Sequence, residues 1–178
     1  MYRKYIDILS NCSKNILEQM ANIDISDVTI KQEKTLLATY SISHSINYED
    51  SKNKVKGNFI LGFADDSEAI PIAKAIAENI GLSAIENFEE IAPDVINEFL
   101  NTVVGHSITE CHKEGLYVSF RTPVVTQNNQ INISDTSNTI VYLISLDFTP
   151  RMIKFDFKTQ SLSFLVTFTK TGDDELLR

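Results

Sequence analysis

The chain has 178 residues, of which 43% are hydrophobic and 22% charged, an ordinary composition for a globular protein that buries a core of its own. Its net charge of −8, with the basic residues scattered among more numerous acids, disfavours nucleic acid and an anionic membrane surface as partners. No apolar run reaches the roughly 18 residues of a membrane span. Asp7 interrupts the apolar stretch that a signal peptide would need, and two cysteines make no disulfide framework. We therefore expect a cytoplasmic protein.

The first half of the chain predicts a helix followed by a pair of strands. From Tyr2 to Met20 apolar residues recur every three or four positions, the spacing of an amphipathic helix: Tyr5, Leu9, Cys12, Ile16 and Met20. Alternation of apolar and polar residues predicts a half-buried strand over Leu36–Ile46. A polar turn over Asn47–Asn53 would then lead to an antiparallel partner strand over Val55–Phe63.

Two helices are predicted next. The acidic run that starts at Asp65 suits the positive end of a helix dipole, Pro71 is tolerated early in that helix, and Gly81 provides its stop. The second helix begins near Ile91 and runs to about His106 or beyond. Strands follow at Leu116–Arg121, Thr139–Phe148, Met152–Phe157 and Leu162–Thr169. This order predicts one α+β domain over residues 1–178, with helices packed on an antiparallel sheet.

The second of these helices combines an apolar face with a polar one. At about 100° per residue the apolar side chains share one face: Ala92, Val95, Ile96, Phe99, Leu100 and Val103. Four other positions lie within about 60° of one another on the opposite face: Asp94, Glu98, Asn101 and Gly105. A carboxylate, an amide and a glycine therefore share a face that is open to solvent or to a partner.

This segment resembles the CheC/CheX/FliY family of response-regulator phosphatases. Residues 94–101 fit its pattern Asp/Ser-x-x-x-Glu-x-x-Asn, Pro123 stands about where the family has a proline, and Gly57–Phe63 resembles its glycine-containing strand. Only one Glu-x-x-Asn, at Glu98 and Asn101, lies on a predicted helix, which makes the chain CheX-like and implies a homodimer. The segment Asp147–Gln160 is longer and more polar than the resemblance leads us to expect.

The resemblance implies a function and roles for these residues. The substrate would be the aspartyl phosphate of a CheY-like receiver domain, which carries its own Mg²⁺ and a lysine, so that the phosphatase brings no metal or cofactor. Asn101 would fix the attacking water, because an amide both donates and accepts hydrogen bonds. Glu98 would pair with the receiver's lysine. Gly105 would permit close approach of the partner, and Asp94 would be a supporting acid near the helix start.

Other interpretations stay open for each residue. Glu98 and Asn101 also fit a merely solvated helix face, and the helix dipole alone explains an acid such as Asp94 in a first turn. His44 fits a core or a dimer contact. Three potential zinc ligands, His106, Cys111 and His112, have no fourth partner in a recognisable pattern, so we expect no metal site. The alternative function is a non-catalytic adaptor that binds a response regulator, and a weaker one is a structural dimer.

Overall fold

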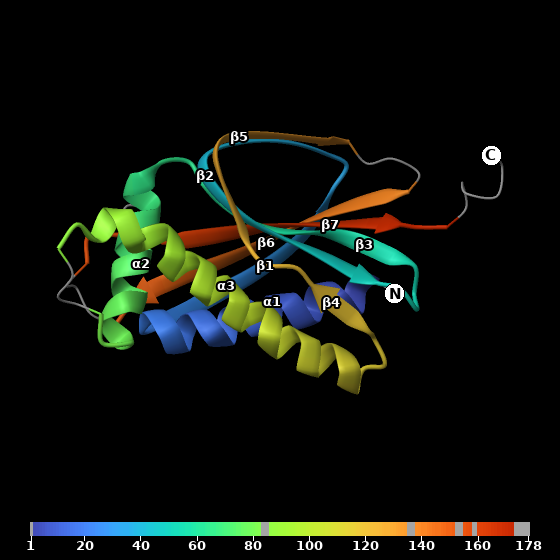
Figure 1. Cartoon of the computed structure of the whole chain (residues 1–178), viewed down its shortest axis with the longest axis horizontal. Helices are drawn as coiled ribbons and strands as arrows, with labels where there is room; N and C mark the ends of the chain where they lie inside the picture. Colours follow the sequence, from blue (N-terminus) through green and yellow to red (C-terminus); the bar gives the residue numbers. More distant parts are fainter. Residues whose placement is uncertain (1, 83–85, 135–137, 152–154, 158–159, 173–178) are drawn as a thin grey trace.

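In the part of the chain that the structure describes, seven strands form one antiparallel sheet, and three helices cover one of its faces (Figure 1). The computed structural model describes residues 2–82, 86–134, 138–151, 155–157 and 160–172. The elements in chain order are α1 Tyr2–Ala21, β1 Ile23–Glu33, β2 Thr35–Asp50, β3 Val55–Phe63, α2 Asp66–Asn79, α3 Phe88–Lys113, β4 Val118–Phe120, β5 Val124–Ser134, β6 Thr139–Pro150 and β7 Ser161–Lys170. The strand order is β1-β6-β7-β3-β2-β4, and β5 also pairs with β2.

The long helices α1 and α3 lie next to each other across the sheet and run in opposite directions (Figure 1). The predicted stripe of α1 is buried, apart from Met20, which is partly buried. Helix α2 ends as the sequence predicts: Gly81 has a φ of +84°, and the amide of Leu82 donates to the Ala77 carbonyl at 2.7 Å. Among the residues that the structure describes, none of the helices has the length and apolar character of a membrane span.

One edge of the sheet is made of two strands that share β2 as their neighbour. Strand β4 pairs with the last residues of β2, and β5 pairs with Thr35 to Ser45. Pro123 lies in the interruption between β4 and β5, where its missing N–H removes a donor from the ladder. The proline therefore breaks this edge strand into two pieces.

Several sequence predictions are wrong in detail, and each error has a physical cause. The turn expected over Asn47–Asn53 starts later, because β2 continues to Asp50 with Tyr48 and Asp50 buried. In the expected strand Met152–Phe157, the Phe157 amide bonds to the Phe155 carbonyl, which is a tight turn, and residues 152–154 lie outside the described residues.

Two strands were not predicted from the sequence. In β1 the register shifts between Ile25 and Asp27, so the apolar residues no longer alternate. Strand β5 is a polar edge strand in which Asn128 has a φ of +49°. Strand β6 runs to Pro150 and so takes in the first part of the polar segment that begins at Asp147.

Stacked aromatic rings in the core hold α3 against the sheet. Phe59 of β3 and Phe164 of β7 stack with parallel rings whose centroids are 5.1 Å apart. Phe99 of α3 packs on Phe164 at 6.4 Å, and its side chain is 0% exposed. Burial of such a ring contributes a few kcal/mol, so the face of α3 that carries Phe99 is firmly fixed toward the sheet.

A buried carboxylate joins three parts of the chain near the N-terminal end of α1 and the C-terminal end of α3. Asp50 accepts hydrogen bonds from the Tyr5 hydroxyl at 2.7 Å, from the Asn53 amide N–H and side chain at 3.0 and 2.8 Å, and from the Tyr117 amide at 2.9 Å. Burial alone would raise the pKa of Asp50, but together these hydrogen bonds lower it below its ordinary value.

We expect Asp50 to make folding pH-dependent at the acid end. Because its pKa is lower in the folded than in the unfolded chain, the stabilisation is complete above the unfolded value of about 3.9 and is lost as the pH falls through the folded value. Asp50→Asn should lower the free energy of unfolding by about 1.5–3 kcal/mol at pH 7. Urea denaturation between pH 7 and pH 2.5 measures both effects. An Asn variant with the wild-type acid profile would contradict this role.

Candidate functional site

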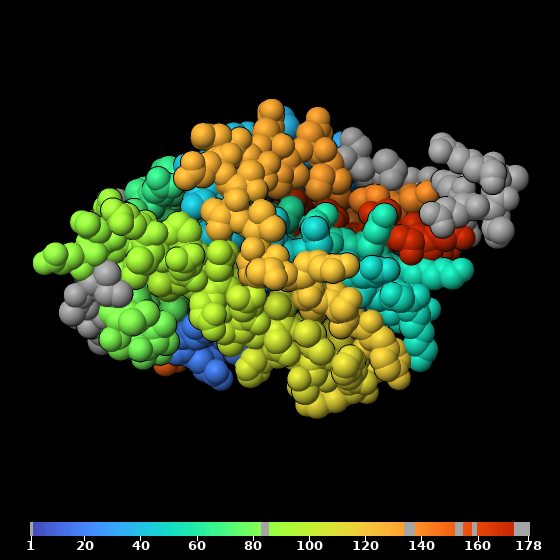
Figure 2. Space-filling model, in the orientation of Figure 1, coloured from blue at the N-terminus to red at the C-terminus, as the bar shows by residue number. Residues whose placement is uncertain are grey.

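The candidate site is the outward face of α3. The six apolar residues that the sequence assigns to the inner face are all buried. The four others, Asp94, Glu98, Asn101 and Gly105, are all exposed and follow one another at intervals of four, three and four residues, and we call them the exposed stripe. Figure 2 shows α3, in yellow-green, open along the front of the molecule.

Helix α3 begins at Phe88, three residues earlier than predicted, which changes the interpretation of Asp94. The acids of the first turn are Glu89 and Glu90, and Asp94 lies in the second turn. Pro93 stands inside the helix, where it leaves the Glu89 carbonyl without its usual amide donor. The helix dipole, which acts mainly within the first turn, therefore does not account for Asp94.

Within the described part of the chain, neither the Glu98 carboxylate nor the Asn101 amide has a hydrogen-bond or ion-pair partner. The neighbouring Thr102 hydroxyl donates to the Glu98 backbone carbonyl at 2.9 Å and leaves the carboxylate untouched. The amide can therefore both donate to and accept from a bound molecule, and the carboxylate can accept from a cation. These groups can orient a water and dock a cationic side chain.

The interruption in the sheet edge lies beside α3. Val125, two residues after Pro123, pairs with His44 of β2. The His44 ring in turn reaches α3, where its Nδ1 is 2.8 Å from the Asn97 side-chain oxygen. Figure 2 shows the chain that follows β4, in gold, directly against α3. Val125 packs against the main core, whereas Val124, the preceding residue of the strand, is 57% exposed.

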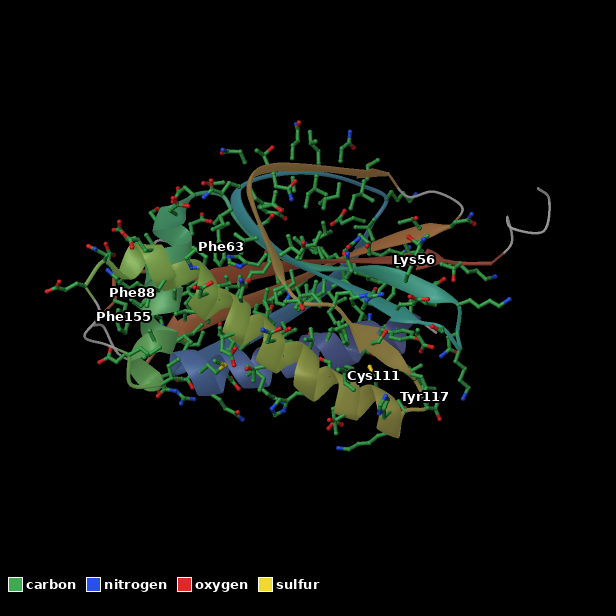
Figure 3. All side chains as sticks on the ribbon, in the orientation of Figure 1. Lys56, Phe63, Phe88, Cys111, Tyr117 and Phe155 are labelled. Carbon is green, nitrogen blue, oxygen red and sulfur yellow. The ribbon has the colours of Figure 1, made fainter. Side chains whose placement is uncertain are left out.

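The candidate zinc ligands are not brought together. Cys111 is buried, and burial raises the pKa of its thiol to about 12. The His112 ring packs against Tyr117, and His106 lines a groove between α1 and α3. Figure 3 shows Cys111 and Tyr117 near the C-terminal end of α3. Among the described residues no group of His, Cys, Asp and Glu is placed to hold a metal ion.

His44 is a core residue, one of the two possibilities that its sequence position left open. It is 0% exposed, and burial lowers its pKa, so the ring is neutral near pH 7. Its contact with Asn97 was not predicted, because nothing in the spacing along β2 points to a partner on α3.

The glycines differ in what the fold requires of them. A methyl group on Gly62 would collide with the Tyr40 ring, and one on Gly57 would collide with the Thr167 carbonyl and the Tyr48 hydroxyl. A methyl group on Gly105 would meet nothing within 4 Å. Glycine inside a helix is less favourable than alanine by about 0.5–1 kcal/mol. The described fold therefore gives no reason for a glycine in the exposed stripe.

Comparison with known proteins places this site in a family context. The sequence matches the family described as "Chemotaxis phosphatase CheX" over residues 50–147, a range that includes the whole exposed stripe. A search of curated proteins finds no match to the chain.

Solved structures share the fold over nearly the whole chain. A CheC-like superfamily protein from Shewanella sp. PV-4 is 18% identical, with a TM-score of 0.68 over 94% of this chain and 99% of that one. A chemotaxis protein CheX from Desulfovibrio desulfuricans is 18% identical, with a TM-score of 0.64 over 94% and 99%. CheX of a Borrelia burgdorferi CheX–CheY–BeF3–Mg²⁺ complex is 16% identical, with a TM-score of 0.55 over 93% and 96%.

Replacing Gly105 by alanine should raise the free energy of unfolding by about 0.5–1 kcal/mol, because the methyl group has room and the unfolded chain loses freedom. The matched control is Gly62→Ala, which should lower it by about 1–3 kcal/mol through the clash with Tyr40. Thermal and urea denaturation of both variants measure the difference. A destabilised Gly105→Ala variant would mean that the fold itself needs this glycine.

Proposed function

The chain belongs to the CheX family of chemotaxis phosphatases, and on that premise we propose that it accelerates hydrolysis of the aspartyl phosphate of a CheY-like receiver domain in the cytoplasm. The observation that carries the proposal is the pair Glu98 and Asn101, exposed and without a partner among the described residues, on a helix whose opposite face is buried. The Borrelia relative, which shares the fold, is a CheX in complex with CheY. That relationship supports a receiver as the partner.

The chemistry needs little beyond placement of a water. An acyl phosphate is already labile, so a catalyst mainly has to hold a water in line with the phosphorus atom. The Asn101 amide would accept a hydrogen from that water with its oxygen or donate to it with its NH₂ group. An amide is no base near neutral pH, so the proton would pass to the phosphate or to solvent. The Mg²⁺ that stabilises the developing charge belongs to the receiver in this scheme.

Glu98 would fix the position of the amide on the receiver. Its carboxylate lies one turn before Asn101 on the same face and would form an ion pair with the receiver's active-site lysine. Partner atoms would exclude water from that pair in the complex, which strengthens the attraction. The docked carboxylate would hold Asn101 over the phosphate.

The ends of the exposed stripe would be contact positions. Gly105 leaves open space four residues after Asn101, which lets the partner's backbone approach α3 closely. Asp94 lies one turn before Glu98 and would add a second acidic contact. The helix dipole does not explain Asp94, and this supports a role for its carboxylate in binding the receiver.

Two copies of the chain would form a homodimer. The sheet face away from the helices carries a small buried apolar cluster of Ile60, Val141 and Leu165, against which Leu36, Ile131 and Ile133 pack. Leu37, which follows Leu36 in β2, is 68% exposed. Strands β1 and β5 lie at edges of the sheet. Exposed apolar surface and strand edges are features that a two-fold interface covers.

Asn101→Ala should abolish the acceleration of receiver dephosphorylation and leave receiver binding nearly unchanged, because the amide acts on the water in the transition state. Single-turnover decay of a phosphorylated receiver measures the rate, and titration with a beryllofluoride-loaded receiver measures the affinity. A wild-type rate in this variant would remove Asn101 from the mechanism.

Glu98→Ala should weaken both binding and turnover, because it removes a charged contact across the interface. Loss of one partner of a buried charge pair costs about 2–5 kcal/mol. The same titration gives the affinity, with Glu89→Ala as a control that removes an exposed carboxylate of α3 outside the exposed stripe. If Glu98→Ala bound as tightly as the wild type, Glu98 would have another role, such as general base.

Light scattering at micromolar concentration should give a mass of about 40 kDa, twice the chain mass of 20.1 kDa. In that dimer both exposed stripes should face solvent. A stable monomer, or a dimer in which Asn101 is buried between subunits, would contradict the proposed assembly.

A further inference from the structure

A partly buried hydrogen bond links β2 of the sheet to the part of α3 that carries Glu98 and Asn101. The His44 ring on β2 is 0% exposed, and its Nδ1 lies 2.8 Å from the Asn97 side-chain oxygen. An amide oxygen only accepts, so Nδ1 carries the hydrogen and donates it. Phe63, labelled in Figure 3, packs edge-on against the His44 ring at 6.4 Å. Asn97 is the residue before Glu98 and lies one turn before Asn101.

This histidine is an unfavourable choice for stability alone. Its Nε2 atom is buried and has no hydrogen-bond partner among the described residues. Burying an unpaired polar atom costs free energy, because the atom has lost its water. A phenylalanine would supply a ring of similar shape without that cost. What the histidine provides and phenylalanine does not is the donor to Asn97.

The hydrogen bond between His44 and Asn97 is directional, whereas the apolar contacts between α3 and the sheet are not. Packing of apolar side chains fixes which face of α3 points to the sheet, but the hydrophobic effect behind it is non-directional. A hydrogen bond needs a defined distance and angle. With side-chain ends about 5–6 Å from the helix axis, a rotation of about 10° moves them by about 1 Å. A displacement of about 1 Å at a reacting centre can cost about 100-fold in rate.

We propose that the His44–Asn97 hydrogen bond is a positioning contact that sets the rotation of α3 and so the placement of the Asn101 amide. This inference rests on the proposed phosphatase function. His44 and Asn97 are positioning residues here. His44 cannot touch the receiver because it is fully buried, and its side-chain hydrogen bond leads to α3.

The test compares His44→Phe, Asn97→Leu and the double variant in receiver dephosphorylation. Each single variant should lower kcat by about 10- to 100-fold. The KM should change less than about twofold, because Glu98 and Gly105 are intact. The double variant should lose no more than either single one, since both remove the same bond. The melting temperature of His44→Phe should equal or exceed that of the wild type.

Tyr5→Phe is the matched control, because it removes a buried hydrogen bond, to Asp50, away from the exposed stripe. It should lower the melting temperature and leave kcat unchanged. An equal loss of kcat in Tyr5→Phe, additive losses in the double variant, or full activity of His44→Phe would each overturn the proposal.

A second measurement does not depend on activity. Backbone ¹⁵N relaxation in the free protein should show larger motion at residues 97–101 in His44→Phe than in the wild type, with α1 unchanged. Unchanged relaxation at these residues would overturn the positioning role. If the wild type failed to accelerate dephosphorylation, that result would count against the proposed function alone, and the relaxation data would still decide whether His44 positions α3.

Discussion

The packing of Phe99 against Phe164 is the contact on which the exposed stripe depends. Phe164 is itself stacked on Phe59, so the aromatic group spans α3, β7 and β3. In a helix with 3.6 residues per turn, fixing one face toward the sheet also fixes which residues point away. Glu98 and Asn101 flank Phe99 in sequence and are turned outward by the same burial. Burial of the core face of α3 thus presents the carboxylate and the amide to solvent.

The residues of the exposed stripe and the residues that stabilise the fold are separate groups. Asp50, Gly57 and Gly62 have close neighbours that explain them: four hydrogen bonds for the carboxylate, and steric contacts for the two glycines. Glu98 and Gly105 have no such neighbours in the described chain. Residues that the fold does not need are free to serve a partner. His44 joins the two groups, because it is a core residue whose side-chain hydrogen bond reaches the helix of the site.

The sequence predicted the parts of this molecule in which one physical rule acts alone. The buried face of α3 follows from helical spacing, and the stop at Gly81 follows from its left-handed backbone. Strand β1 was not predicted because a register shift after Ile25 interrupts its alternation of apolar and polar residues. Strand β5 was not predicted because this polar edge strand has few apolar residues that could show such an alternation. The exposed stripe was found because all its members lie on one helix. The His44–Asn97 contact was not, since pairing between β2 and α3 is decided by tertiary packing.

The central claim is that the exposed stripe makes this chain a catalyst, and not only a partner, of a phosphorylated receiver. The most direct measurement is the decay of a CheY-like receiver, phosphorylated with acetyl phosphate and freed of excess donor, at a tenfold excess over this protein in the presence of Mg²⁺. The account predicts that all of the receiver loses its phosphate faster than it does alone, over several turnovers of each protein molecule. Decay at the unassisted rate, by a protein that binds the same receiver, would contradict it and identify an adaptor.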